Sequence, residues 1–160
     1  MRHICSLATT LVFISLIAGC SSVQVNKPLP AARSAAVKYN IVEVTISSRD
    51  VPELFLDTLI QTLDRKLRNK VVLDASYATR DVHIEITDYR MRNPTARLML
   101  GVLVGDDHAT SSVIVRDSLN HSIIADIDVT SRNVFIFGSE YEVARDHGQD
   151  IANALLQGVR

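Results

Sequence analysis

The 160-residue chain has no excess of charge of either sign, because 17 lysine and arginine residues stand against 18 aspartate and glutamate residues. A nucleic-acid-binding domain carries a basic patch or stripe, so this balance argues against that class. It argues equally against a polybasic surface for anionic lipids. The chain also lacks the Gly-x-Ser-x-Gly motif of a nucleophile elbow and a glycine-rich phosphate loop, so two common classes of enzyme have no motif here.

Apolar runs long enough to span a membrane are missing as well. The N-terminal run, from Ile4 to Ile17, is interrupted by serine and threonine residues. A membrane-spanning helix needs about 20 predominantly apolar residues, which this run does not supply. One basic residue, Arg2, precedes the run and small residues follow it, as in a secretory signal peptide. The sequence therefore predicts that residues 1–19 are a signal peptide.

The run ends in Ile17-Ala18-Gly19-Cys20, a branched apolar residue and two small residues before a cysteine. This motif resembles the lipobox of bacterial lipoproteins. The resemblance implies cleavage before Cys20, a lipid on its thiol and acylation of the new amino group, and several acyl chains anchor a protein stably. Ser21 stands where inner-membrane retention usually shows aspartate. The resemblance therefore implies anchoring in the outer membrane, with the domain facing the periplasm.

Cleavage at this position would leave 141 residues with 16 basic and 18 acidic side chains, which suits one domain and a tether. One of the two cysteines would leave with the signal peptide, and the other, Cys20, would carry the lipid. The mature chain then has no second thiol for a disulfide. Thiol catalysis and cysteine-based metal sites are excluded with it. We expect no cofactor apart from the covalent lipid at Cys20.

The segment after the lipidation motif has no sustained hydrophobic period, and Pro28 and Pro30 interrupt it. We expect residues 20–38 to form a lipidated tether without regular structure. A flexible chain of this length would reach roughly 20–25 Å on average, enough to hold the domain just clear of the lipid headgroups. Residues 39–160 would then form the folded domain.

The domain contains six segments with a clear hydrophobic period. Alternation or helical spacing assigns them as strands over 39–48, 82–92, 111–117 and 122–130 and helices over 51–68 and from Ser139 onward. In the first strand the apolar face, expected to be buried, carries Val42, Val44 and Ile46. Asp50 with Glu53 and Ser139 with Glu142 have the spacing of capping boxes at the two helix starts. The β-α-β-β-β-α order predicts an α+β fold. We expect a mostly antiparallel sheet of about four to five strands, covered on one face by two helices.

Two apolar runs, residues 98–104 and 134–137, fit no amphipathic surface element. One interpretation is that the first is a strand buried on both faces and the second packs beneath the start of the second helix. The other is an exposed patch that contacts a partner protein or the membrane surface. The side chains of this candidate partner patch are Leu98, Leu100, Val102, Phe135 and Phe137.

Candidate acid–base and metal-ligating side chains occur, but they do not combine into a nucleophile, a base and an orienting group. His83 and Glu85 share the polar face of one predicted strand, which favours a solvated face. Asp106-Asp107-His108 is predicted to be a polar loop tip, and His147 to border the core or face water. We therefore expect neither a metal site nor an enzyme.

The second half of the chain carries Arg97-x-x-x-Gly101-x-x-x-Gly105, then Val113-x-Val115-x-Asp117 and a return strand from Ile123. This pattern resembles a family of small envelope lipoproteins known only as a domain of unknown function. The layout is also similar to that of the YajG-like outer-membrane lipoproteins. The resemblances imply a non-enzymatic α+β lipoprotein that binds or helps assemble other envelope components. A carrier for a lipid or small apolar ligand is the alternative, and a periplasmic cell-wall enzyme is a third.

Overall fold

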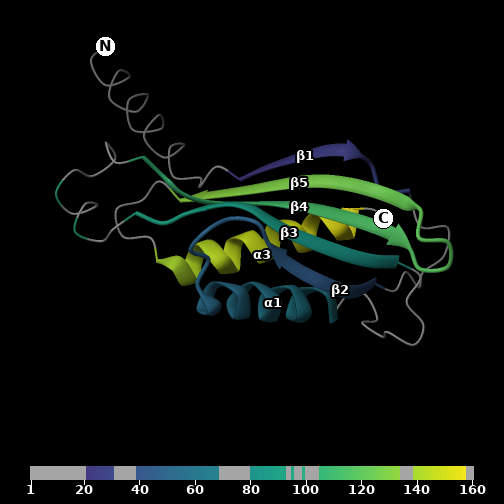
Figure 1. Ribbon diagram of the computed structural model, residues 1–160, viewed down its shortest axis with the longest axis horizontal. Helices are drawn as coiled ribbons and strands as arrows, with labels where there is room; N and C mark the ends of the chain where they lie inside the picture. The colour runs from purple at the N-terminus through teal and green to yellow at the C-terminus, as the bar shows by residue number, and fades with distance from the viewer. Residues whose placement is uncertain are drawn as a thin grey trace, which may run out of the picture.

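The computed structural model describes residues 21–30, 39–68, 80–92, 95, 99, 105–133 and 139–157. One five-stranded sheet carries two helices on one of its faces (Figure 1). The elements in chain order are β1 (Ser22–Lys27), β2 (Tyr39–Ile46), α1 (Glu53–Arg68), β3 (Arg80–Arg90), β4 (Asp107–Asp117), β5 (Ile123–Asn133) and α3 (Glu140–Gln157).

The order of the strands across the sheet is β1-β5-β4-β3-β2. Three of the neighbouring pairs are antiparallel, whereas β2 runs parallel to β3. A parallel pair needs a crossover connection, and α1 lies in the connection between these two strands. The predicted α+β fold with two helices on one face is confirmed. The sheet is mixed rather than purely antiparallel, and it holds one strand, β1, that the sequence did not predict.

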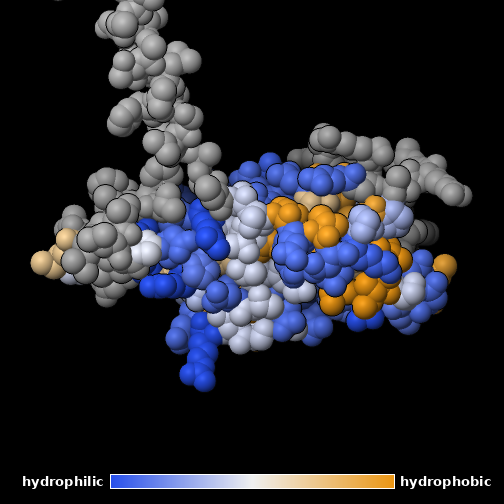
Figure 2. All heavy atoms as spheres, turned by 90° about the horizontal axis from the view of Figure 1, so that it is seen from above, coloured by the Kyte–Doolittle hydropathy of each residue, from blue (hydrophilic) through white to orange (hydrophobic). Residues whose placement is uncertain are grey.

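The expectation of a tether without regular structure is wrong for residues 22–27, because these residues form β1 at the edge of the sheet. The strand pairs with β5 from Ser22↔Thr130 to Lys27↔Asp126. Its side chains are all exposed, and Val23 and Val25 remain 40% and 48% exposed. Figure 2 looks onto this side of the molecule and shows hydrophobic side chains among polar ones. Two valines are too weak a pattern to identify a strand whose backbone partners are supplied by β5.

The other edge strand, β2, departs from its predicted alternation because a β-bulge lies between Ile41 and Glu43. A bulge adds one residue and exchanges the faces of the side chains that follow it. Ile41 and Val44 therefore contact the core, while Val42 is 50% exposed, against the prediction that it faces inward. A similar irregularity interrupts β1 between Val25 and Lys27, so both edges of the sheet carry a bulge.

The core lies between the sheet and the two helices. The alternating residues of the central strands point into it as predicted, and α1 contributes a stripe at helical spacing. The large side chains buried in the core include Phe55, Leu59, Leu63 and Leu67 from α1 and Val82, Ile84 and Ile86 from β3. Each such side chain stabilises the fold by about 1.5–3 kcal/mol through burial.

The second helix, α3, begins with the predicted capping box. The Ser139 hydroxyl accepts a hydrogen bond from the Glu142 amide at 3.2 Å, and the Glu142 carboxylate accepts one from the Ser139 amide at 2.9 Å. Together they satisfy two backbone donors at the helix start. The start of α1 is different from the prediction, because Asp50 has φ of 60° and lies outside a helix that begins at Glu53.

Gly148 lies in the middle of α3, where glycine lowers helix stability. A Cβ atom at this position would lie 3.1 Å from the carbonyl oxygen of Leu59 and 3.1 Å from the Cβ of Thr62. The missing side chain therefore lets α3 approach α1 closely. No helix among the described residues is long and apolar enough to cross a membrane.

Candidate functional site

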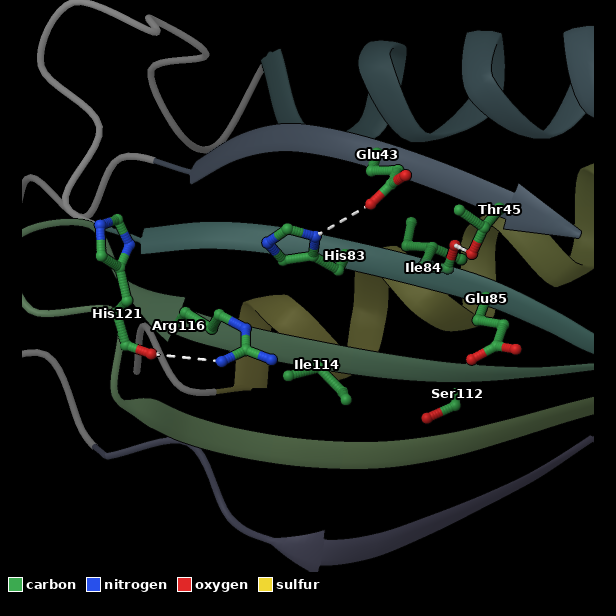
Figure 3. Close-up of a pocket in the computed structure, with 9 residues that line it drawn as sticks. All are labelled: Glu43, Thr45, His83, Ile84, Glu85, Ser112, Ile114, Arg116 and His121. Carbon is green, nitrogen blue, oxygen red and sulfur yellow. Dashed lines mark hydrogen bonds and ion pairs between the residues drawn. The ribbon is translucent and has the colours of Figure 1, made fainter.

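The face of the sheet opposite the helices carries an open groove of about 520 Å³ across β2, β3 and β4 (Figure 3). Side chains that alternate away from the core line most of it, since successive residues of a strand point to opposite faces. The lining residues are Glu43, Thr45, His83, Ile84, Glu85, Ser112, Ile114, Arg116 and His121.

Charged groups of both signs lie along this groove. The His83 Nδ1 atom is 3.6 Å from the Glu43 carboxylate, and both side chains are partly exposed. The Arg116 guanidinium donates a hydrogen bond to the His121 carbonyl oxygen at 3.3 Å, and Glu85 accepts one from Ser47 at 2.5 Å. The prediction that His83 and Glu85 share a polar face is confirmed. The strand pairing adds Glu43 and Arg116, which are distant in the sequence.

The groove offers an open surface that a partner can contact. The groove is open to solvent, so it does not supply the water-excluded pocket in which charged groups act most strongly on a reacting molecule. Among the described residues, no group of three histidine, cysteine, aspartate or glutamate side chains is placed to hold a metal ion. Polar groups of both signs around Ile114 can instead contact an extended polar partner.

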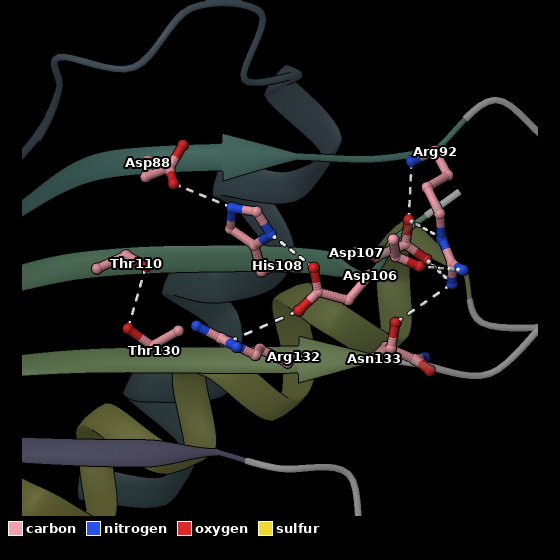
Figure 4. Close-up of polar contacts among 10 residues, drawn as sticks. Asp88, Arg92, Asp106, Asp107, His108, Thr110, Thr130, Arg132 and Asn133 are labelled. Carbon is pink, nitrogen blue, oxygen red and sulfur yellow. Dashed lines mark hydrogen bonds and ion pairs between the residues drawn. The ribbon is translucent and has the colours of Figure 1, made fainter. Parts of the chain in front are cut away.

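A second polar cluster lies where β3 ends and β4 begins, and its centre is a buried ion pair (Figure 4). The Arg92 and Asp107 side chains are 1% and 0% exposed, and the Arg92 Nε atom lies 3.1 Å from the Asp107 carboxylate. Arg92 also donates to the carbonyl oxygens of Gly105 and Asn133, at 2.6 Å and 3.3 Å. One guanidinium therefore connects three segments of the chain at this end of the sheet.

The prediction of a polar loop tip at Asp106-Asp107-His108 is wrong, because Asp107 and His108 are the first residues of β4. Asp107 is buried because Arg92 compensates its charge. His108 lies on the outer face between two carboxylates, with Nε2 3.0 Å from Asp88 and Nδ1 3.4 Å from Asp106. These contacts join neighbouring elements, and they occupy both ring nitrogens of His108.

His147 of α3 is fully buried, which places it deeper in the fold than a residue at the border of the core. Its Nε2 atom lies 2.7 Å from the Ser111 hydroxyl and its Nδ1 atom 2.9 Å from the Ser131 hydroxyl. Burial lowers the pKa of His147 to about 4, so the ring is neutral near pH 7. Ser111 and Ser131 come from β4 and β5, and no pattern near His147 in the sequence pointed to them.

The polar network continues from His147 to the surface. The Ser131 hydroxyl donates to the Asp150 carboxylate at 2.6 Å, and the Ser21 side chain forms a hydrogen bond with Asp150 as well. Burial raises the pKa of Asp150, and the hydrogen bonds from Ser131 and Ser21 partly offset this increase. A hollow of about 220 Å³ lies here, with Arg132 on its wall. The residue next to the predicted lipidation site is thus fastened to α3.

The remaining predicted site residues lie outside the described residues. They are the lipidation site and lipobox (Cys20, Ile17, Ala18 and Gly19) and the candidate partner patch (Leu98, Leu100, Val102, Phe135 and Phe137). Their roles stay predictions. Some described residues lie close to them in the chain, and Met99, between Leu98 and Leu100, is 78% exposed.

No family model matches the sequence, and no curated protein matches it either, so the resemblances inferred from its motifs have no sequence-level support. The fold, however, is similar to that of PelC from Paraburkholderia phytofirmans, solved as a dodecamer in two crystal forms, one of them of a point variant. The sequence identity is 14%, and the TM-scores are 0.58 and 0.54. The alignments cover 88% of this chain and 98% and 99% of PelC.

A weaker likeness is found to a candidate lipoprotein from Caulobacter crescentus, with 10% identity, a TM-score of 0.41 and coverage of 71% of this chain and 88% of the other. The likeness to PelC extends over nearly the whole of that protein. By its fold, this chain is therefore an α+β domain similar to PelC.

Proposed function

We propose that this chain is a non-enzymatic lipoprotein, anchored in the outer membrane through Cys20 and facing the periplasm, that helps assemble an envelope complex as a multimer. The observation that carries the proposal is the likeness of fold to PelC, a dodecamer, over nearly the full length of that protein. The lipobox supplies the anchor, and the open groove on the sheet supplies a surface for a further component.

The state of the acid–base side chains supports a binding role. The His147 ring is fully buried and hydrogen-bonded to Ser111 and Ser131, so it is not exposed to a substrate in solution. His108 is held between two aspartates. Seven of the nine residues that line the groove, and all of those that line the smaller hollow, are polar or charged, which suits a partner that carries polar groups.

The multimer is tested by measuring the mass of the acylated protein in detergent with light scattering or native mass spectrometry. We expect a multimer of defined size. The matched control is a Cys20→Ala chain produced without the signal peptide, because acyl chains alone can gather several copies in one micelle. A multimer that persists in the control assembles through the domain. A monomer at all concentrations in both samples would refute assembly of the chain with itself.

The anchor has an independent test. In cells fed a radioactive fatty acid, the wild-type chain should be labelled and recovered with the outer membrane on a density gradient. Cys20→Ala should abolish the label and leave an uncleaved precursor, because the thiol that takes up the lipid is missing. Labelling that persists in the variant would exclude Cys20 as the anchor.

A further inference from the structure

The predicted lipid attachment site is separated from the folded sheet by one residue. Cys20 is followed by Ser21, and β1 begins at Ser22. Two residues of extended chain span about 7 Å, far less than the 20–25 Å reach of a flexible tether over residues 20–38. An acyl group on Cys20 would therefore hold the sheet close to the bilayer.

The first two described residues after the predicted attachment site, Ser21 and Ser22, both contact the domain. Ser21 hydrogen-bonds the Asp150 side chain of α3, and Ser22 pairs with Thr130 of β5. Farther along β1, the Asn26 amide donates to Asp128 at 2.9 Å, and the Lys27 ammonium donates to the carbonyl oxygen of Ile123. Because the strand is held along its length, Ser21, which follows the predicted attachment site, has a defined position on the fold.

The direction of the strands decides which end of the molecule this position occupies. β1 is antiparallel to β5, so it begins where β5 ends, at Asn133. The pairing of Asp107 with Asn133 and of Arg90 with His108 places the start of β4 and the end of β3 at the same end. The start of α3 lies there too (Figure 1). We name this part of the molecule the anchor end.

The two apolar runs of the sequence are connected to the anchor end as well. Residues 98–104 belong to the connection from β3 to β4, and residues 134–137 belong to the connection from β5 to α3. The described residues on either side of these connections lie at this end. The Arg92 guanidinium donates to the carbonyl oxygens of Gly105 and Asn133, and α3 starts at the same end (Figure 1). Thus β1 begins at one end of the fold, and the chain leaves and rejoins the described fold around both apolar runs at that same end, while the β4–β5 hairpin around Leu119 lies at the other.

We propose that the anchor end is a membrane-facing surface whose partner is the phospholipid bilayer, and that β1 fixes this orientation. The proposal rests on the lipid anchor of the proposed function. β4 and β5 each have 11 residues, so the two ends of the sheet are separated by about 35 Å at roughly 3.3 Å per residue. The hairpin end, with His121 of the groove, is thereby directed away from the bilayer.

Single thiols at the two ends test the orientation. The mature chain has no free cysteine once Cys20 is acylated, so Met99→Cys and Leu119→Cys each provide one labelling site. The two positions form a matched pair, because their side chains are 78% and 93% exposed. Each acylated variant is labelled with the same fluorophore and reconstituted into phosphatidylethanolamine and phosphatidylglycerol vesicles that contain a headgroup-linked quencher. We expect loss of most of the fluorescence at position 99 and of almost none at position 119.

A longer connection provides the control for β1. Inserting 12 glycine and serine residues between Ser21 and Ser22 leaves the sheet intact and adds a reach of roughly 20 Å. We expect the quenching at position 99 to fall to the level at position 119. Equal quenching at both positions before the insertion, or quenching unchanged by it, would overturn the proposed orientation.

Flotation of the vesicles separates the two proposals. A protein that floats with the vesicles but is quenched equally at both ends has an anchor without a fixed orientation, so only the membrane-facing surface is refuted. A protein that does not float has no working anchor, and both proposals then fail. Strong quenching at position 119 alone would mean that the hairpin end faces the bilayer, which contradicts the inference.

Discussion

Replacing Arg92 with methionine should be among the most destabilising single changes in this fold. The substitution keeps much of the side-chain volume but removes the Arg92 guanidinium from the Asp107 carboxylate, which is 0% exposed. It also removes the donors to the carbonyl oxygens of Gly105 and Asn133. Removing one partner of a buried ion pair costs about 3–5 kcal/mol. At about 2–4 °C per kcal/mol for a chain of this length, the melting temperature should fall by roughly 10–15 °C.

Thermal unfolding followed by circular dichroism measures this effect, and a double variant identifies its cause. Arg92→Met with Asp107→Leu removes both charges of the buried pair, so it should recover about half of the lost stability. The recovery is incomplete because the carbonyl oxygens of Gly105 and Asn133 still lack their donor. A single variant that melts within 2–3 °C of the wild type, on the order of 1 kcal/mol, would refute the reasoning. A double variant no more stable than the single one would assign the loss to packing.

The remaining predictions concern α3 and its contacts. The pKa of His147 is about 4 in the folded protein and near 6.5 in the unfolded chain. The free energy of unfolding should therefore be fully retained above pH 6.5 and should fall by roughly 3 kcal/mol as the pH drops to 4. The raised pKa of Asp150 acts in the opposite direction and partly offsets this loss. Urea midpoints should show the decline, and His147→Gln should flatten it. Ser139→Ala should cost about 1 kcal/mol by removing the cap, and Ser139→Asp should restore most of it, as melting temperatures would show. Gly148→Ala should lower the free energy of unfolding by about 1–2 kcal/mol, because crowding against the Leu59 carbonyl outweighs the gain in helix propensity. A variant more stable than the wild type would contradict the close approach of α3 to α1.

The parts of the fold predicted from sequence are those with strong local periodicity. Val82, Ile84 and Ile86 alternate through β3, and the α1 stripe repeats at helical spacing, so burial of one face determined their structure. The capping box at Ser139 is local too, because both of its members lie within four residues. β1 escaped prediction because it holds only two apolar residues and depends on backbone partners in β5, about 100 positions away.

The candidate site was less predictable because its contacts join distant positions. Asp107 looked like a loop residue, since no neighbouring residue indicates that it pairs with Arg92, 15 residues upstream, in the interior. The hydroxyl partners of His147 lie 36 and 16 positions before it. His83 and Glu85 were placed on an exposed face correctly, but strand pairing was needed to bring Arg116 beside them. Local patterns identify faces, whereas long-range pairing decides which faces meet.

The bulges in the two edge strands would affect how copies of this chain contact one another in the proposed membrane-anchored state. The proposed anchor would confine many copies to a plane, where neighbouring sheets collide edge to edge far more often than in free solution. An unbroken edge would present a continuous row of amide and carbonyl groups to each neighbour and invite open-ended strand addition. The breaks at Val25/Lys27 and at Ile41/Glu43 interrupt that row on both sides. Strand addition between neighbouring copies would therefore stop at these breaks, and the proposed multimer would form through other surfaces.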